Sequence, residues 1–543
     1  MDWRILYNIY DDLASHDSAE NPAYEGVFCA LEPLSTTLDP VELAAVLLAS
    51  LSPLLTISAL WQIKEWRADR MLDHLRSEGM LRQTLGVIRI PVLLPWYLVA
   101  ALSMASVEIV SQGAVLSMLG IGMLQWILHR QPRPVWTQKA MMIVGLSLLL
   151  TAMLGVTLRG NPLLLPLLTV LQPVVCAISW ILLLPLDWFL KRRILRSAAA
   201  LRQAHPTLTV IGITGSVGKT TTKELIACAL QEQAAATPAY VNSEIGVARW
   251  LSAQLSRPGS RPSILIVEMG AYRSGEIRTL CEIARPSFGV VTYVGTQHIA
   301  LFGSQERLIA AKGELLEALP EQGRAFVNAD SSFALGMRSR ARCPVTLVST
   351  GGSSDLEGFD IEETPRGLSM RIGTTKFSVP LHGTQNATNV LLAVAVAEAL
   401  GVQRNVVANR LARFRPLSGT FSVEERRGVT ILNDTHNCSP ESASAAIRWA
   451  EHQPAAQKVL LTPGIIEQGR ETLRVHRDLG VQSSTVFGRV LFTNKKFAQI
   501  FSQGYGKNVD VLSKNSAPVE HGALLVCLGR VSPSIIDRLL PAP

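Results

Sequence analysis

The chain has 543 residues, a formal net charge of +8 and seven cysteines. This length suggests about three domains, since domains usually hold roughly 100–200 residues. The cysteines are far apart and none lies in a Cys-x-x-Cys pair, so the sequence indicates neither a zinc site nor a disulfide framework. Much of the positive charge follows long apolar runs, which favours a role in membrane topology, and we expect no nucleic-acid partner.

Apolar runs of the length that crosses a bilayer, roughly 20 residues, dominate the first third of the chain. An acidic tail, residues 1–39, precedes them and shows no cleavable signal peptide. We expect residues 40–190 to form a multi-pass α-helical transmembrane domain of about five helices. The expected helices are Val41–Trp61, Ile90–Val110, Gly113–Leu128, Ala140–Leu158 and Pro162–Leu186.

Two of these runs leave the number of crossings open. The third run is short, and the fifth contains Pro166 and Pro173. A kinked or re-entrant segment is an alternative for either run, and roughly four or six crossings are alternatives for the total. Glu108 is a carboxylate deep in the second run. An intramembrane acid is a candidate functional residue, and a position at the membrane interface is the alternative.

Lysines and arginines follow the first, third and fifth runs, which predicts that these ends face the cytoplasm. The last such group, Lys191-Arg192-Arg193 with Arg196, lies in a basic linker at residues 191–205. We therefore expect a protein of the inner (cytoplasmic) membrane whose remaining domains are cytoplasmic.

A glycine-rich turn follows the apolar run Leu208–Ile213 and opens a helical stretch. Small residues let backbone N–H groups point at phosphate oxygens, a lysine reaches the β- and γ-phosphates, and a hydroxyl binds Mg²⁺. The general pattern has glycine where Ile213 stands, so the loop is a variant, and a chance lysine in a glycine-rich turn is the alternative. The expected phosphate-binding residues are Gly215, Ser216, Gly218, Lys219, Thr220 and Thr221.

From Leu208 onward, apolar runs alternate with helical stretches, which predicts a parallel sheet covered by helices. The next two runs are Ile264–Val267 and Gly289–Val294. Ligands in such folds bind at the carboxyl ends of the strands. Glu268 ends the second run and His298 follows the third, so both are candidate site residues.

Further motifs follow the glycine-rich turn in a fixed order. They are Asn242-Ser-Glu-Ile-Gly246, Glu268-Met-Gly270, Gly275-Glu-Ile277, His298 with Phe302-Gly303-Ser304, Ala311-Lys-Gly-Glu314, Asn328-Ala-Asp330, Asn386-Ala-Thr-Asn389 and Asp434-Thr-His-Asn437. This series resembles the Mur ligase family, most closely the branch that adds D-alanyl-D-alanine to a UDP-N-acetylmuramoyl-tripeptide. The resemblance covers about residues 206–470, with a weaker tail beyond.

The resemblance implies a P-loop, parallel-sheet ATPase domain at residues 206–416 and a Rossmann-like C-terminal domain at residues 417–543. In the first domain, a helix is expected at Ile309–Ala318 and another at Val390–Leu400. In the second, Val429–Asn433 is expected as the first strand, and Lys458–Thr462, Thr485–Leu491 and Ala523–Leu528 as further strands.

The activity implied is that of an ATP-dependent acid–amino acid ligase. ATP would phosphorylate a carboxylate acceptor, and the amine of an amino acid or short peptide would attack the acyl phosphate. The implied cofactors are ATP and Mg²⁺. The implied catalytic residues are Lys219, Glu268, His298 and Lys312, and the implied metal ligands are Thr220, Glu268 and His298.

The resemblance also assigns residues around the nucleotide. It places Asn386 and Asn389 at the adenine, with an N-cap pair as the alternative. It places Asp434 at the ribose, with an ordinary turn aspartate as the alternative. Lys312 aligns with a lysine that is carbamylated in many family members, and both a carbamylated and an unmodified lysine stay open.

Several departures from the family pattern concern the substrates. The membrane part stands where the closest branch has its UDP-sugar-binding domain, which argues for a membrane-delivered, lipid-linked carboxylate. The family's Pro-Gly-Arg is Ser418-Gly419-Thr420 here, so a nucleotide-contacting arginine is missing, and Arg426 or Arg427 could substitute. Two amine-side motifs have also changed: they read Leu528-Gly529-Arg530-Val531 and Gly464-Ile-Ile-Glu-Gln-Gly469.

Three functional hypotheses follow. The favoured one is a membrane-anchored ligase acting in cell-envelope (including peptidoglycan), capsule or secondary-metabolite biosynthesis. The second is the D-alanyl-D-alanine-adding ligase with an unusual anchor. The third is a transport component with a nucleotide-binding domain, although the signature motifs of transport ATPases are not found.

Overall fold

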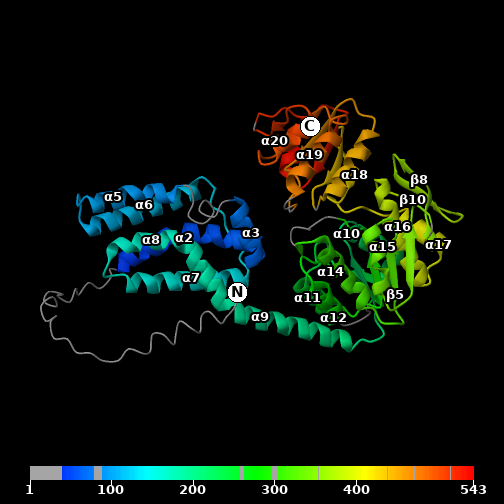
Figure 1. Ribbon diagram of the computed structural model, residues 1–543, viewed down its shortest axis with the longest axis horizontal. Helices are drawn as coiled ribbons and strands as arrows, with labels where there is room; N and C mark the ends of the chain where they lie inside the picture. The colour runs from blue at the N-terminus through cyan, green and yellow to red at the C-terminus, as the bar shows by residue number, and fades with distance from the viewer. Residues whose placement is uncertain are drawn as a thin grey trace. The chain divides into compact units, whose positions relative to one another are not determined.

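The computed structural model describes residues 40–78, 88–256, 262–295 and 302–542, apart from 353, 437, 467, 469, 470 and 514. The chain divides into two compact units, one ending at Phe189 and the other beginning at Leu190. We call them the helical unit and the α/β unit; Figure 1 draws the first in blue to cyan-green and the second in green to red. The division falls next to the boundary expected at residue 190.

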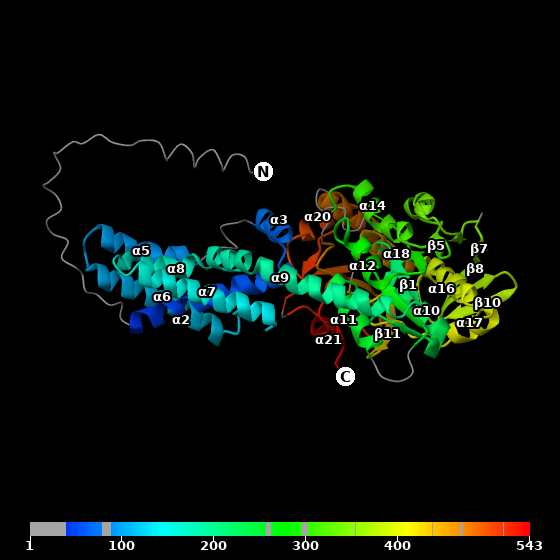
Figure 2. The same cartoon turned by 90° about the horizontal axis from the view of Figure 1, so that it is seen from below.

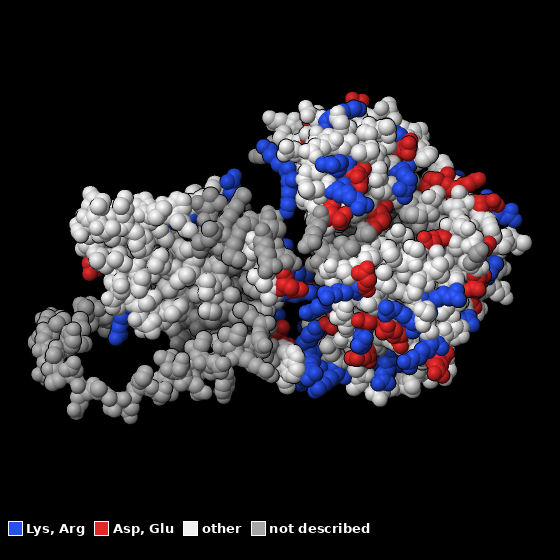
Figure 3. Space-filling view, viewed as in Figure 1, with Lys and Arg blue, Asp and Glu red and all other residues white. Residues whose placement is uncertain are grey.

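The helical unit contains several helices, most of which are apolar. They are α2 (Pro40–Ile63), α3 (Ala68–Glu78), α5 (Arg89–Ala101), α6 (Val107–Ile127), α7 (Gln138–Thr157), η1 (Pro162–Leu164), α8 (Leu165–Val170) and the start of α9 (Gln172–Gln203). Among the described residues, four helices are long and apolar enough to cross a membrane, namely α2, α6, α7 and α9. The visible face of this unit carries few charged side chains (Figure 3).

The second expected span, Ile90–Val110, was wrong as a single helix. Helix α5 ends at Ala101, and α6 begins at Val107 because the Ser106 side chain accepts a hydrogen bond from the N–H of Ile109. An N-cap serine of this kind satisfies one of the free donors of a helix start, and hydropathy does not detect it. Glu108 is exposed in the first turn of α6, where an acid stabilises the helix dipole.

The fifth expected span is broken, as its prolines indicated. Pro162 begins η1, Pro166 lies in the first turn of α8, and Pro173 lies in the first turn of α9. Proline is tolerated at such positions because the first turn of a helix needs no N–H donor there. The kinked alternative for this segment is therefore confirmed.

The residues expected as a basic linker, 191–205, mostly belong to α9, which continues to Gln203. Ala198 on this helix is fully buried, and Leu195 and Leu201 pack against the core of the α/β unit. Arg193 and Arg196 are exposed. The last four turns of α9 are therefore an amphipathic helix that is part of the α/β unit.

Arg202 anchors the end of this helix. Its guanidinium donates to the carbonyl oxygens of Ala284 (2.9 Å), His205 (2.6 Å) and Leu208 (2.9 Å), and only 5% of the residue is exposed. We expect Arg202→Ala to lower the free energy of unfolding by about 3 kcal/mol, because buried carbonyls would lose their donors. Thermal unfolding of the purified chain measures this loss. Arg196→Ala, on the exposed face of α9, is the control; equal melting temperatures for the two variants would contradict the prediction.

The central part of the α/β unit, up to residue 416, is built on a parallel sheet, as expected. Its strands are β1 (Thr209–Thr214), β2 (Ala234–Ala236), β3 (Ile264–Glu268), β4 (Phe288–Val291), β5 (Arg324–Asn328), β6 (Val345–Ser349) and β7 (Leu356–Glu357). They are ordered β2-β3-β1-β4-β5-β6-β7. All neighbouring strands pair in parallel, which places their carboxyl ends along one edge.

Helices cover both faces of this sheet. One face buries α11 (Glu244–Leu255), α12 (Glu276–Ala284) and α14 (Gln305–Glu317). The other face buries α10 (Lys219–Leu230), α16 (Ala387–Ala399) and α17 (Arg404–Leu411). Figure 2 shows α10 and α16 side by side. Short helical segments lie at Gln231–Gln233 (η2), Ser332–Gly336 (α15), Arg338–Arg340 (η3) and Thr384–Asn386 (η4).

A three-stranded antiparallel sheet precedes α16 and was not predicted. It consists of β8 (Phe359–Thr364), β9 (Gly367–Ile372) and β10 (Thr375–Val379), in the order β10-β9-β8. Met370 and Phe377 from this sheet are buried in the same core as α16. The small sheet therefore supports the helix start that faces the candidate site.

The C-terminal part, from residue 417, contains a second mostly parallel sheet. Its strands are β11 (Ser422–Arg426), β12 (Val429–Asp434), β13 (Lys458–Thr462), β14 (Arg489–Phe492), β15 (Asp510–Val511) and β16 (Leu524–Leu528), in the order β11-β12-β16-β13-β14-β15. Its helices are α18 (Pro440–Glu451), α19 (Thr472–Ser483), α20 (Ala498–Tyr505) and α21 (Pro533–Leu539).

Two expectations for this part were wrong. The strand beginning at Val429 is not the first, because β11 precedes it and pairs with it antiparallel at the sheet edge. The strand expected from Thr485 begins only at Arg489, because the N–H groups of Val486 and Phe487 bond back to Ser483 at the end of α19. Apolar composition alone did not separate this turn from the strand.

Candidate functional site

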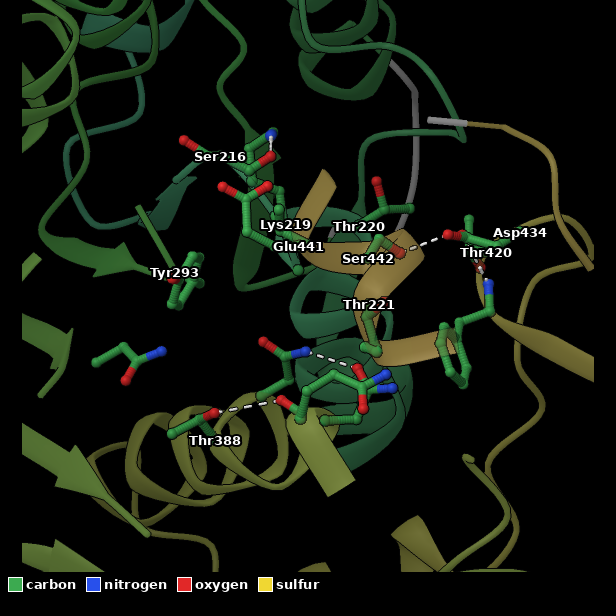
Figure 4. A pocket seen from close by; sticks show the side chains of 18 of the residues that line it. Ser216, Lys219, Thr220, Thr221, Tyr293, Thr388, Thr420, Asp434, Glu441 and Ser442 are labelled. Atoms are coloured by element: carbon green, nitrogen blue, oxygen red, sulfur yellow. Dashed lines mark hydrogen bonds between the residues drawn. The ribbon is translucent and has the colours of Figure 1, made fainter. Parts of the chain in front are cut away.

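A cavity of about 370 Å³ lies where the glycine-rich turn, the start of α16 and the start of α18 meet (Figure 4). It opens at the carboxyl ends of the central strands, where ligands bind in parallel-sheet folds. The structure brings most of the predicted site residues into its lining. These are Ser216, Gly218, Lys219, Thr220, Thr221, Glu268, Asn386, Asn389 and Asp434.

Two glycines shape the turn between β1 and α10. Gly215 has φ +148° and Gly218 has φ +87°, a region that other residues rarely adopt. A Cβ on Gly215 would lie 2.0 Å from Thr292 Oγ1, and a Cβ on Gly218 would lie 2.5 Å from Asn389 Oδ1. The turn therefore requires glycine at both positions; Gly215 itself supports the cavity without lining it.

The backbone donors of the turn differ from the expectation. The N–H groups of Ser216 and Val217 donate to the carbonyl of Tyr293 (2.8 and 3.3 Å), so they do not point at a ligand. The first bond within α10 runs from Thr222 N to Gly218 O (2.8 Å). The N–H groups that precede Thr222 in the helix have no intrahelical acceptor, and such a helix start attracts phosphate.

Two side chains complete this phosphate-like subsite. The Ser216 hydroxyl is buried and, among the described residues, has no hydrogen-bond partner. Lys219 Nζ donates to the carbonyls of Gly215 and Ser216, both at 2.9 Å. Burial lowers the pKa of Lys219, while the nearby Glu268 carboxylate opposes this shift. An anion in the cavity would meet a hydroxyl and an ammonium group on adjacent parts of one loop.

Glu268 ends β3 and is 2% exposed. Its carboxylate accepts hydrogen bonds from Thr220 Oγ1 (3.0 Å) and Asn242 Nδ2 (3.1 Å). Lys223 Nζ lies 3.6 Å from Oε2 of the same carboxylate. The described residues hold no group of three or more His, Cys, Asp or Glu that could bind a metal ion. The Thr220–Glu268 oxygen pair is of the kind that holds Mg²⁺ together with substrate phosphates.

Lys223 was not among the predicted residues. It is fully buried in α10, and its Nζ donates to Thr237 O (2.8 Å) and lies 3.1 Å from Glu224 Oε1. A lysine is rarely buried unless it is paired. Lys223 follows Lys219 by four residues, and this helical spacing was the signal that both face the same side. Lys223 therefore connects the Glu268 carboxylate to Thr237, the residue that follows β2.

Lys312 lies on α14, where it is only 3% exposed and does not line the cavity. Burial, together with the charge of Lys219, lowers the pKa of Lys312 to about 7, and the nearby acids Glu276, Glu314 and Glu268 oppose the shift. Among the described residues its amine has no hydrogen-bond partner. It is therefore a partly neutral, desolvated amine.

Glu314, from the same sequence motif, has a structural role. Its carboxylate accepts hydrogen bonds from the N–H groups of Gly275 (2.6 Å) and Arg278 (3.0 Å). These groups lie at the start of α12, where a helix has free donors. The two motifs that contain Gly275 and Glu314 are thus explained by their contact with each other.

Asn386 and Asn389 face one another at the start of α16. Asn389 Nδ2 donates to Asn386 Oδ1 (2.8 Å), and Thr222 Oγ1 donates to Asn389 Oδ1 (3.1 Å). Asn386 occupies the N-cap position of α16, but its side chain makes no capping bond. The N-cap alternative for this pair is therefore wrong, and the pair links α10 to α16 beside the cavity.

Asp434 ends β12 and is 6% exposed. Burial raises the pKa of Asp434, while hydrogen bonds from Ser442 Oγ and the N–H of Phe421 oppose the shift. Figure 4 shows the Ser442 bond. Both carboxylate oxygens have partners within the C-terminal part, so the carboxylate is fixed in place.

The chain that forms this site is similar to known proteins. Residues 213–397 match the Mur ligase middle domain. A UDP-N-acetylmuramoyl-tripeptide--D-alanyl-D-alanine ligase of Synechocystis sp. is 33% identical over 335 residues, which cover 61% of this chain and 71% of that protein. The chain belongs to the Mur ligase family. Members of this family are ATP-dependent ligases that form amide bonds.

A second Mur ligase matches over a smaller share of its own length, and two solved Mur ligase structures have a similar fold. The ligase of the same description from Mycobacterium bovis is 34% identical over 300 residues, and the match spans 58% of its length. MurF from Thermotoga maritima, solved in complex with ADP, is 25% identical, with a TM-score of 0.55 over 64% of this chain and 82% of that one. MurF from Acinetobacter baumannii, 24% identical with a TM-score of 0.59, covers 64% of this chain and 80% of its own and shows the same fold.

In this Mur ligase, Arg426 and Arg427, the two candidate substitutes for the family's nucleotide-contacting arginine, bind other residues. Arg426 pairs with Glu424 (2.7 Å) and Asp537 (2.8 Å), and Arg427 donates to the carbonyl of Pro541 (3.2 Å). Neither lines the cavity. The hypothesis that one of them substitutes is therefore not supported.

The cavity also contains residues that the sequence did not single out. Tyr293 follows β4, and α18 contributes Glu441, Ser442 and Arg448. In Figure 4, Glu441 lies beside Ser216 and Lys219. Ala445, which also lines the cavity, lies four residues after Glu441 and three before Arg448. This helical spacing was a signal that the three share one face, but only the packing of the C-terminal part shows which face meets the cavity. Four residues of the sequence motifs, His298, Asn437, Glu467 and Gly469, lie outside the described residues.

Proposed function

We propose that this Mur ligase joins a carboxylate to the amine of an amino acid or short peptide while converting ATP to ADP and phosphate. The γ-phosphoryl group passes to the carboxylate, the amine attacks the resulting acyl phosphate, and phosphate leaves. The observation that carries the proposal is the joint lining of one cavity by Lys219, Thr220 and Glu268. Family membership favours a ligase over a transport component.

Mg²⁺ would be held by Thr220 and Glu268, whose oxygens lie 3.0 Å apart. The unpartnered Ser216 hydroxyl and the free helix start of α10 fit phosphate oxygens on the same side. His298 is assigned to a second Mg²⁺ by the family resemblance. When bound, Mg²⁺ neutralises the charge that develops on the phosphate oxygens. The Lys219 ammonium would supply further positive charge at the transferred phosphoryl group.

Lining residues from α16 and from the C-terminal part suit the rest of the nucleotide. Asn386 and Asn389 would contact the adenine with amide groups, and Asp434 would accept from a ribose hydroxyl. Arg448 also lines the cavity and, among the described residues, has no acidic partner. We assign it the nucleotide contact that the family's missing arginine would otherwise make.

Two substrate classes remain candidates. The relatives named above support D-alanyl-D-alanine as the amine and a UDP-linked muramoyl tripeptide as the acceptor, in peptidoglycan synthesis. A lipid-linked acceptor is the alternative, and its support is the apolar helical unit in the same chain. For the location we propose the inner membrane, with the helical unit inserted and the α/β unit in the cytoplasm, from the positions of lysine and arginine.

Phosphate release by the detergent-purified chain tests the function. Mg-ATP is supplied with D-alanyl-D-alanine, other dipeptides or single amino acids, and with either a UDP-muramoyl tripeptide or a membrane lipid extract. Release that requires both an amine and an acceptor supports the ligase and names both substrates. Hydrolysis that is independent of every amine contradicts it.

Lys312 gives a prediction about pH. Because its pKa is about 7, its amine is mostly neutral above that pH, and only a neutral amine combines with CO₂. We expect ¹³C-bicarbonate to produce a carbamate signal in the NMR spectrum at pH 8 that fades below pH 7. Lys312→Arg should abolish the signal. A wild-type chain without this signal at pH 8 would show that Lys312 is an unmodified lysine.

A further inference from the structure

Glu363 on β8 receives three hydrogen bonds, two from adjacent residues before η4 and one from α18. Oε1 accepts from His382 Nδ1 (2.6 Å) and from Trp449 Nε1 (2.9 Å), and Oε2 accepts from the N–H of Gly383 (2.9 Å). Hydrogen bonds to an ionised acceptor are roughly twice as strong as neutral ones. Although burial alone would raise the pKa of Glu363, these three donors hold it below its usual value.

Two of these bonds shape the nucleotide side of the cavity. Gly383, with φ +87°, starts η4, and its N–H is held by Glu363. Asn386, at the end of η4, donates from Nδ2 to the carbonyl of His382 (2.8 Å). Thr384 and Asn386 line the cavity, whereas Glu363 does not. Glu363 therefore holds the segment that presents the adenine-side residues.

The third bond reaches the C-terminal part. Trp449 is near the end of α18 and is 7% exposed. Its ring also packs edge-on against His382, with centroids 5.8 Å apart, and against Phe421 at 6.5 Å. Arg448, the residue before Trp449, lines the cavity. One carboxylate thus contacts elements on both sides of the cavity, and α18 and β8 can be followed in Figure 1.

We propose that Glu363 is a positioning residue that couples nucleotide binding to the placement of the C-terminal part over the cavity. It acts by joining the 382–386 segment to α18 through the Trp449 indole. This inference rests on the proposed function, because it takes a nucleotide as the ligand of the cavity. Its prediction is that breaking the Glu363–Trp449 bond weakens nucleotide binding although neither residue touches the nucleotide.

The neighbouring sequence offers a matched control. Glu362 is on the same strand, is exposed, and has no partner among the described residues. Trp449→Phe removes the indole donor, together with part of the ring volume, and keeps an aromatic ring for packing on Phe421. Glu363→Gln weakens the whole group of bonds. A second contact between the central and C-terminal parts is left intact by all variants: the tilted ring contact of Tyr240 with His436, with centroids 3.7 Å apart.

The experiment is calorimetric titration of the detergent-purified full chain with Mg-ADP, alongside melting temperatures without nucleotide. We expect Trp449→Phe to weaken Mg-ADP binding about tenfold, the size of one hydrogen bond to a charged group. Glu363→Gln should weaken it at least as much, and Glu362→Gln should not change it. The double variant should resemble Glu363→Gln alone, because both changes remove the same bond.

A residue that only stabilises the fold would lower the melting temperature without changing the affinity for Mg-ADP. Wild-type affinity in both single variants, or additive losses in the double variant, overturns the inference and leaves the proposed function standing. A wild-type chain that does not bind Mg-ADP overturns both. If Glu363→Gln does not fold, Trp449→Phe and its control decide the question.

Discussion

Replacing Lys219 by alanine is expected to reduce ATP-dependent product formation at least about 100-fold, the usual effect of removing one preorganised donor to a developing charge. Its ammonium is already held beside the cavity by the carbonyls of Gly215 and Ser216. It needs only a change of side-chain rotamer to meet a phosphate. Phosphate release under saturating Mg-ATP, with the substrates that the panel identifies, measures the loss.

The Lys219 variant should remain folded, because this side chain is only partly buried and its two partners are backbone carbonyls of the loop. Lys376→Ala on β10 is the matched control, since Lys376 is exposed and does not line the cavity. An equal melting temperature with lost activity assigns Lys219 to chemistry or binding. Full activity of Lys219→Ala would rule out this cavity as the ATP site.

Glu268→Gln is the second change with a large expected effect. The substitution keeps the shape of the side chain but removes the charge that would hold Mg²⁺ with Thr220. We expect turnover to fall at least about 100-fold and the Mg²⁺ concentration for half-maximal activity to rise. Titrating phosphate release with Mg²⁺ at fixed ATP separates these two effects.

The environment of Glu268 sharpens this test. Lys223 lies 3.6 Å away and would keep Glu224 as its remaining acidic partner in the variant, so the buried ammonium would not be left unpaired. We therefore expect only a modest loss of stability. Glu282→Gln, an exposed position on α12, serves as the control. An unchanged Mg²⁺ requirement in Glu268→Gln would contradict the metal assignment.

The strands that carry the site were predictable because each is a short apolar run bounded by polar or glycine residues. The runs ending at Ile213, Val267 and Asn433 each end one residue before the strands β1, β3 and β12 do. In a parallel sheet these ends meet at one edge, so the proximity of Lys219 and Glu268 could be inferred from sequence.

Other features depend on local bonds that composition does not reveal. The break between α5 and α6 depends on the Ser106 cap, and hydropathy alone merged the two helices. The sheet β8–β10 consists of short strands joined by tight turns, and its partner in the core, α16, follows it in the chain. The role of Glu363 could not be predicted, because its donors are separated from it by up to 86 positions.

The side of the cavity formed by the C-terminal part was the least predictable. Asp434 was found from its motif, but Glu441 and Arg448 were not. Their positions on α18 fit several orientations of that helix, and only the bonds from Ser442 to Asp434 and from Trp449 to Glu363 fix one of them.

The continuity of α9 bears on how this chain tolerates length changes. Because residues 172–203 form one helix, the residues before and after Leu190 share a single helical phase. An α-helix turns by about 100° per residue, so one inserted residue between Leu190 and Leu195 would turn the residues before it by about 100° relative to Ala198 and Arg202 or oblige the helix to break. Seven inserted residues would restore the phase to within about 20°. Chimaeras that join this α/β unit to another membrane segment should therefore be designed by counting helical turns.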